Sequence, residues 1–327
     1  MPALSPDEPE RALAHRPSEP SPSTEAQCRW RRWTALADAL TPVLMAPQGQ
    51  PHALECLQNS ARELIALCHE DADMGIFFMV HDTPDKLRRY GVLHAVHTAT
   101  LLTLVARRRD WSPGLTLNAV LAGLTMNLSI TPLQSELARQ ATPLSASQRA
   151  HILAHPQASH DLLVAMGVTD AECLTAVAQH HEQSDGKGYP ARIACKHLLA
   201  DAVRTCDIYS AKMSPRVGRS VVQGPQATTQ IFRERSANYF GATLTREMGL
   251  YPPGSLVELN DGRLAVVVRR GRDLSLPEVV ALSDASGTAW HPIARFMTAD
   301  RGTHIVAASE VADWGQRIDP EAVLSHG

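Results

Sequence analysis

The chain has 327 residues, enough for about two domains on the usual scale of ~150 residues each. Its hydrophobic content of 44% allows a sizeable core, and its net charge of -3 argues against a nucleic-acid or membrane-surface partner. The six cysteines form no C-x-x-C pair, no signal peptide opens the sequence, and no apolar run approaches ~20 residues. We therefore expect a cytoplasmic protein with reduced thiols and no membrane span.

The N-terminal part of the sequence divides into a polar segment and a helical stretch. Residues 1–25 are rich in Pro, Ser and Glu, which bury too little apolar surface to order a chain, so we expect disorder there. Residues 26–90 have helical periodicity, with Leu57, Ala61 and Leu64 on one face. The sequence predicts an N-terminal helical module over 26–90, and no catalytic motif stands out in it.

Residues 91–250 are predicted to form consecutive helices. Apolar periodicity predicts helices over 92–108, 115–128 and 197–213. A helix over 148–154 should end at His155, because the proline that follows disfavours helical geometry in the residue before it, and another helix should run from 156 to 166. Thr169 and Glu172 have the spacing of a capping box and predict a further helix start.

The character of the sequence changes after about residue 250. Two β-rich runs, 256–259 and 264–268, flank Asp261-Gly262, a dipeptide that favours a hairpin turn. A third strand is predicted over 277–282. The sequence thus predicts a mainly α protein that ends in a small β module over 251–300 and a polar C-terminal tail over 301–327.

Five residues with metal-binding side chains lie on segments that otherwise have the pattern of a hydrophobic core. They are His94, His155, His180, His181 and Asp207. A neutral imidazole is the commonest protein ligand for transition metals, and carboxylates complete such sites. Each residue alone is more simply explained as a core or surface group, but the five together predict a metal centre.

The segment that begins at His180 carries a more specific signal. His180-His181-Glu182 followed by Asp185-Gly186-Lys187-Gly188-Tyr189-Pro190 resembles the HHE…DGxGYP signature of HD-GYP domains. His94, the His155-Pro156 step and Asp207 match further family positions in register, so the resemblance covers roughly residues 90 to 290. It implies an HD-superfamily helical bundle over 91–250.

The resemblance also implies an activity. HD-GYP domains are metal-dependent phosphodiesterases that hydrolyse the bacterial second messenger cyclic di-GMP, which makes this chain resemble a bacterial signalling protein. In the family two or three ions, usually iron or manganese, activate a water that attacks the phosphate in line. A carboxylate that bridges two of the ions offsets their mutual repulsion.

The sequence departs from the family at this bridging pair. The register places the family's His-Asp at Thr125-Met126 and its following lysine at Ser129. Threonine is a poor neutral ligand, and the soft thioether of methionine does not suit hard or borderline divalent ions. The change removes an imidazole, the bridging carboxylate and one negative charge, and Ser210 replaces a second aspartate in the segment of Asp207.

Three interpretations follow from this departure. We expect a degenerate, non-catalytic regulator that binds a partner protein or cyclic di-GMP and holds at most one transition ion (Fe, Mn or Zn) at His155, His180 and His181. The alternative is an active phosphodiesterase with an altered or single-metal site, in which Asn127, Glu182 or Asp185 supplies the missing oxygen. The third is a structural helical adaptor without metal. None of the three involves a nucleic-acid or membrane partner.

The glycine-rich loop supports a separate prediction. In the family this loop contacts partner proteins, including GGDEF-domain proteins, and forms the rim of the site. Its glycines permit backbone angles that other residues resist. We expect a ligand or such a partner to bind the loop residues Glu182, Asp185, Gly186, Lys187, Gly188, Tyr189 and Pro190. The simpler alternative is that the two glycines only turn the chain.

Overall fold

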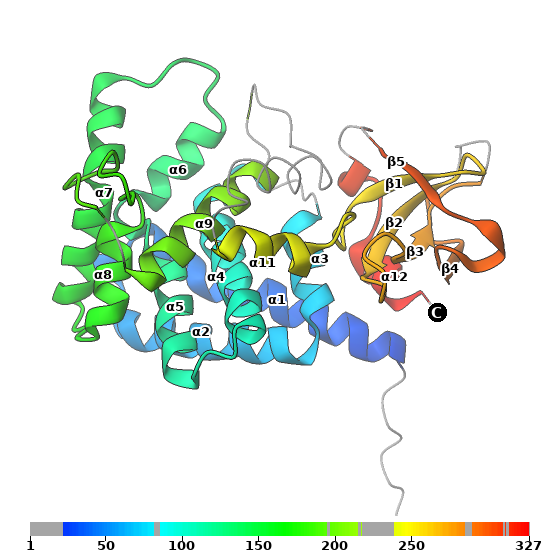
Figure 1. Cartoon of the computed structure of the whole chain (residues 1–327), viewed down its shortest axis with the longest axis horizontal. Coiled ribbons are helices and arrows are strands. Elements are labelled where there is room, and N and C mark those ends of the chain that lie inside the picture. Colours follow the sequence, from blue (N-terminus) through cyan, green and yellow to red (C-terminus); the bar gives the residue numbers. More distant parts are fainter. Residues whose placement is uncertain are drawn as a thin grey trace, which may run out of the picture.

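In the part of the chain that the structure describes, the elements up to Met248 are helices, and an antiparallel sheet follows. The computed structural model describes residues 22–81, 86–194, 197–214, 217, 239–284, 290–309, 311 and 314–326. Figure 1 shows the helices in one body, with the sheet at one end of it and α7 (Ala146–Ala165) and α8 (Ala171–Gln179) at the other. The predicted fold class, mainly α with a small C-terminal β module, is confirmed.

The N-terminal helices pack directly against the helices that follow them. They are α1 (Pro22–Met45), α2 (Ala53–Glu70) and α3 (Ala72–Val80). In α2 the predicted apolar face of Leu57, Ala61 and Leu64 is fully buried. Helix α1 begins inside the segment 1–25 that was expected to be disordered, and the rest of that segment, 1–21, lies outside the described residues.

A nearly all-buried helix forms the centre of the fold. In α4 (Tyr90–Arg108) every residue from Tyr90 to Ala106 is buried, and the helix contacts α1, α2, α5 (Pro113–Thr125), α6 (Thr131–Ala138), α9 (Leu198–Met213) and α11 (Tyr239–Met248). The helix is buried on all sides because it has neighbours around it, and its polar side chains, such as Thr98 and Thr100, bond to backbone carbonyls of the same helix. The stretch Pro113–Ala138 has the length and apolar character to cross a membrane, but 72% of its most apolar 18-residue window is buried inside the fold, as in a core helix.

Side-chain caps set the starts of the outer helices. Ser145 and Gln148 form a capping box at the start of α7. Helix α8 begins one residue later than predicted, because the carboxylate of Asp170, and not Thr169, accepts the bond from the backbone N–H of Cys173 at 2.9 Å. His197 caps α9 in the same way.

The β module is a five-stranded antiparallel sheet in the order β4-β3-β2-β1-β5. Its strands are β1 (Leu256–Leu259), β2 (Leu264–Arg269), β3 (Glu278–Ala281), β4 (Ala294–Met297) and β5 (Ile305–Ala308). The predicted hairpin is confirmed, with Val257 paired to Ala265 and Gly262 at φ 83° in the turn. The third predicted strand is β3.

The predicted tail over 301–327 needs correction. Strand β5 lies in that stretch and pairs with β1, where Val257 is opposite Ala308. After it, α12 (Pro320–Ser325) packs on α1, and Glu321 forms an ion pair with Arg31 at 2.8 Å. The stretch looked polar because β5 is only four residues long and has polar neighbours on both sides, although all four of its residues, Ile305–Ala308, are apolar.

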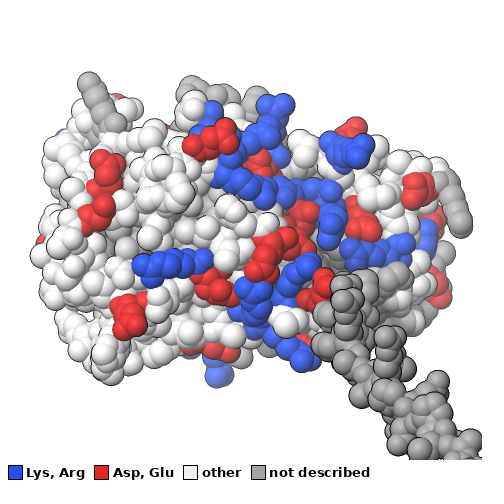
Figure 2. Space-filling model, turned by 90° about the horizontal axis from the view of Figure 1, so that it is seen from below, with Lys and Arg blue, Asp and Glu red and all other residues white. Residues whose placement is uncertain are grey.

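Charged side chains on the face formed by α1 and α2 are mixed in sign. Figure 2 shows Lys and Arg beside Asp and Glu over the middle of this face, with no large area of one sign. Arg32 is paired with both Glu63 and Glu70, and Arg107 with Glu247. The positive charges of these arginines are thus partly neutralised by acidic neighbours.

A buried histidine joins the N-terminal helices to the C-terminal segment. The ring of His81 stacks on Phe77 and lies edge-on to Trp30 and Trp314. Burial, together with the nearby charge of Lys86, lowers the pKa of His81 from 6.5 to about 3. The folded protein therefore resists protonation at a site that the unfolded chain protonates below about pH 6.5.

We expect His81 to destabilise the protein as the pH falls. Between about pH 6.5 and pH 3 the unfolded state binds this proton and the folded state does not, which costs about 2 kcal/mol at pH 5 relative to pH 7.5. Denaturant titrations at both pH values should show a smaller loss of stability for His81→Phe than for the wild type. The exposed His151→Phe is the matched control, and an equal loss in all three proteins would contradict the prediction.

Candidate metal centre

His155 lies in the middle of a continuous helix. The predicted break at His155-Pro156 is wrong, because α7 runs unbroken through Pro156. The proline leaves the carbonyl of Ile152 without its usual donor four residues on. Nδ1 of His155 lies 2.6 Å from that oxygen and donates in its place. This bond both repairs the helix and fixes which ring nitrogen carries the proton.

His180 is held in the same way at the end of α8. Its Nδ1 lies 2.7 Å from the carbonyl of Val177 and donates to it. In both rings the proton is therefore on Nδ1, and Nε2 presents a lone pair. Backbone bonds of this kind are typical of histidines that bind metals, since they orient the ring and select the tautomer.

The two free lone pairs point at each other. Nε2 of His155 is 3.1 Å from Nε2 of His180, and the ligand atoms of His155, His180 and His181 all lie within 4.8 Å of one another. Two acceptors at this distance repel unless a cation is shared between them. Nitrogens bound to one ion at about 2.0–2.1 Å lie roughly 3 Å apart, so the three residues, called here the His triad, fit a transition ion.

The protonation states of the His triad also suit metal binding. Burial, with the charge of His180, lowers the pKa of His155 to about 3. Burial lowers the pKa values of His180 and His181 as well. All three rings are thus neutral near pH 7, which is the form that coordinates metals.

The other two predicted ligands contact each other instead of the His triad. Nε2 of His94 is 2.7 Å from Oδ1 of Asp207 in a buried pair, and Ser210 Oγ is 3.1 Å from Nδ1 of His94. Burial alone would raise the pKa of Asp207, but the hydrogen bond and charge of His94 hold it below its usual range. The pair lies beside the His triad, since Asp207 interacts electrostatically with His155, His180 and His181, but only the three imidazoles have ligand atoms within 4.8 Å of one another.

Thr125 and Met126 lie at the end of α5, which contacts α4, α8 and α9. Both side chains are fully buried. The hydroxyl of Thr125 donates to the carbonyl of Leu121 in its own helix at 2.7 Å, and Met126 is part of the hydrophobic core. Ser129 bonds to Ser159 and to the carbonyl of His155, which fastens this segment to α7.

The loop after His181 is held from inside by Glu182. This carboxylate is buried and accepts backbone N–H bonds from Ala191, Arg192 and Ile193 at 2.6, 3.0 and 3.2 Å. These bonds show that Glu182 shapes the loop, and its predicted contact with a ligand stays a prediction.

Gly186 and Gly188 are each required in the loop, for different structural reasons. A Cβ on Gly188 would lie 2.4 Å from Cα of Glu182 and from the carbonyl of His181, so no side chain fits there. Gly186 has φ of 72°, in the left-handed region. Between them, Lys187 is exposed and pairs with Asp185 at 3.3 Å. The loop folds tightly back on the His triad and presents these two charges to solvent.

Tyr189 forms one wall of the triad. Its ring stacks on His181 with centroids 4.5 Å apart and an interplanar angle of 19°. Burial raises the pKa of the Tyr189 phenol. Pro190 follows through a cis peptide bond and is exposed. The tyrosine thus limits how far the ring of His181 can turn.

Comparison with known proteins decides the family. The family described as "HD domain" matches residues 79–244, which is half of the chain. Over 198 residues the chain is 30% identical to the Pseudomonas aeruginosa protein named cyclic di-GMP phosphodiesterase PA4108. The chain belongs to the HD domain family and is an HD-GYP domain protein.

The matches to these HD-GYP relatives cover only part of each chain. The match spans 58% of this chain and 47% of the Pseudomonas protein, so the chain spans about half the length of that curated relative. The solved structure of Bd1817, described as an HDG"Y"P protein from Bdellovibrio bacteriovorus, shares the fold with a TM-score of 0.53 at 15% identity, over 70% of this chain and 73% of that one.

The HD-GYP site contains residues that sequence reasoning missed. Arg204, on α9 one turn before Asp207, donates to the carbonyl of His181 at 3.4 Å and places a cation beside the triad. Its position three residues before Asp207 on one helix face was the available signal. Ser159, fully buried against Ser129, gave no signal in the sequence.

The His triad of this HD-GYP domain fits a transition ion. Three imidazoles hold a transition ion and leave a position open for water or a phosphate oxygen, and a bound ion would act there as a Lewis acid that lowers the pKa of such a water. Arg204 adds a positive charge that favours an anionic ligand. The carboxylate of Asp207 is already paired with His94.

Proposed function

We propose that this HD-GYP protein is a degenerate member of bacterial cyclic di-GMP signalling, which binds the nucleotide or a partner protein without hydrolysing the nucleotide. The observation that carries the proposal is the burial of Met126 in the hydrophobic core at the register position of the bridging aspartate. An apolar side chain there supplies no anionic oxygen to hold two cations close together.

The carboxylates near the triad are engaged elsewhere, which supports the same proposal. Asp207 is paired with His94, and Glu182 accepts three backbone N–H groups. Asp185 is exposed and bonded to Lys187. Asn127 offers only a neutral amide. Asn127, Glu182 and Asp185 were the residues considered as sources of the missing oxygen, and none of the three offers an unengaged carboxylate to a second ion.

The ligand and partner follow from the relative and the family. We assign cyclic di-GMP as the nucleotide because the Pseudomonas relative is named as its phosphodiesterase, and Arg204 suits a phosphate. One Fe, Mn or Zn ion at the His triad would complete the site. A GGDEF-type protein in the cytoplasm is the proposed partner, and Lys187 and Pro190 are exposed on the loop to meet it.

A second candidate is an active phosphodiesterase with a single-metal or altered site. It is favoured by the retained His triad and by Tyr189 and Arg204 beside it. The two candidates differ in turnover, and an altered site with two ions would differ from the regulator in ion content as well; they do not differ in nucleotide binding.

Elemental analysis of anaerobically purified protein, followed by binding and turnover assays with cyclic di-GMP, tests the proposal. We expect at most one ion per chain, lost in His181→Ala, with nucleotide binding and no product. Two ions per chain with turnover that His181→Ala abolishes would establish the active enzyme instead. If the protein bound neither metal nor nucleotide, the structural helical adaptor would be the remaining interpretation.

A further inference from the structure

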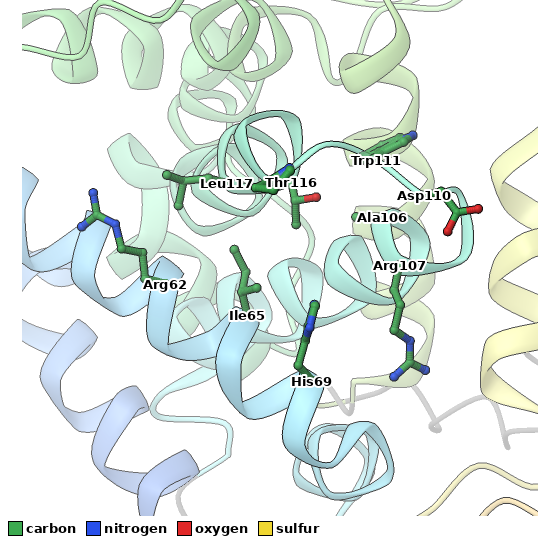
Figure 3. Close-up of a pocket in the computed structure, with 10 residues that line it drawn as sticks. Arg62, Ile65, His69, Ala106, Arg107, Asp110, Trp111, Thr116 and Leu117 are labelled. Atoms are coloured by element: carbon green, nitrogen blue, oxygen red, sulfur yellow. The ribbon is translucent and has the colours of Figure 1, made fainter.

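A cavity separate from the His triad lies where the N-terminal helices meet the HD-GYP helices. It has a volume of about 490 Å³ and lies between α2, the end of α4 and the start of α5 (Figure 3). Its lining is dominated by apolar groups, among them Ile65, Ala106, Trp111 and Leu117. None of the residues that line the cavity belongs to the His triad or to its loop, and Ala106 is about 18 Å along α4 from His94 at 1.5 Å per residue.

The polar groups of the cavity lie at its rim. In Figure 3 Ile65 and His69 project from α2 toward α4 and α5, whereas Arg62 and Arg107 extend to the edges of the cavity. Both arginines are exposed. Arg62 donates to Asn59 at 3.0 Å, and Arg107 reaches Glu247 at 3.5 Å. Each guanidinium has further N–H groups beyond these bonds.

The charge of the rim selects the kind of ligand. The lining includes two arginines and His69 but only one acidic residue, Asp110. The carboxylate of Asp110 points away from the middle of the cavity in Figure 3. A cavity with an apolar interior and a cationic edge fits a molecule with a hydrophobic body and one negative group. Trp111 adds a flat aromatic surface, which suits an aryl or short alkyl body.

We propose that this cavity binds a small soluble organic anion, an aryl or medium-chain alkyl carboxylate or sulfonate, as a second ligand site of the protein. The volume lies within the range of small-molecule pockets, ~300–1,000 Å³. The apolar body occupies the space between Ile65 and Leu117, and the anionic group is held by Arg62 and Arg107 at the rim.

The probe for this site is 8-anilinonaphthalene-1-sulfonate, an aromatic anion whose fluorescence rises in apolar surroundings. We expect saturable binding to the folded protein, and displacement by octanoate but not by octylamine, which has the same chain length and the opposite charge. Leu117→Trp fills the cavity and should weaken binding by at least about tenfold. Arg62→Gln, on the exposed surface, should keep the fold and weaken binding by about threefold to fivefold.

Matched variants elsewhere serve as controls. Leu153→Trp places the same bulk at an exposed position on α7, and Arg149→Gln removes an exposed charge from the same helix. Both should bind the probe as the wild type does. The proposal would be overturned if Leu117→Trp and Arg62→Gln bound the probe as strongly as the wild type does. It would also be overturned if the two α7 variants weakened binding as much as the cavity variants, or if octylamine displaced the probe as well as octanoate. The metal content of Arg62→Gln should stay unchanged, which separates this site from the His triad.

Discussion

Met126→Asp is expected to lower the unfolding free energy of the metal-free protein by about 3–5 kcal/mol. The side chain of Met126 is fully buried in the hydrophobic core, and a carboxylate placed there would be a buried charge without a partner. Denaturant titration in the presence of a chelator measures the loss. Met126→Leu keeps the volume and should cost less than about 1.5 kcal/mol.

The double variant Thr125→His/Met126→Asp extends this test to function. Because the end of α5 contacts the helices that carry His94, His180 and Asp207, the restored pair should bind about one more Mn²⁺ per chain than the wild type, and Mn²⁺ should recover most of the lost stability. If Met126→Asp left the metal-free protein as stable as Met126→Leu, the position would not be the dry core site on which the proposed function depends.

Glu182→Ala is expected to cost about 3 kcal/mol and to loosen the loop beside the His triad. The substitution removes the buried carboxylate that accepts three backbone N–H groups, each of which would lose its partner within the loop. Hydrogen exchange at Ala191, Arg192 and Ile193 should accelerate, and denaturant titration should show the loss of stability. Because the loop carries Tyr189, which stacks on His181, the metal affinity of the triad should fall as well.

Asp185→Ala is the control for this prediction. Asp185 belongs to the same loop but is exposed, so its loss should change stability by less than about 0.5 kcal/mol. Equal effects of the two substitutions on hydrogen exchange at 191–193 would show that Glu182 is not the residue that holds the loop.

Local signals in the sequence determined several helices and strands of this protein and the motif of its glycine-rich loop. The apolar face of α2, the Asp261-Gly262 hairpin and the sequence of the loop after His181 were readable because each depends on residues a few positions apart. The helix start at Asp170 was missed by one residue, because two neighbouring side chains were both suitable caps and only geometry chooses between them.

Only the tertiary structure decided how the candidate ligands combine. His94 and Asp207 are 113 residues apart and pair with each other, and the triad joins α7 to the end of α8. The sequence counted five ligands but could not assign them to one group, since distances between helices depend on packing. The same holds for β5, whose partner strand β1 lies far before it in the chain.

The continuity of α7 has the same origin. A proline preceded by histidine predicts a helix boundary from local preference alone. In the fold, the His155 ring bonds to the carbonyl that Pro156 leaves without a donor, and helix α8 places His180 against that ring. Sequence therefore determined many of the elements and the chemical groups of this protein, whereas packing between distant segments determined the remaining elements and which groups meet.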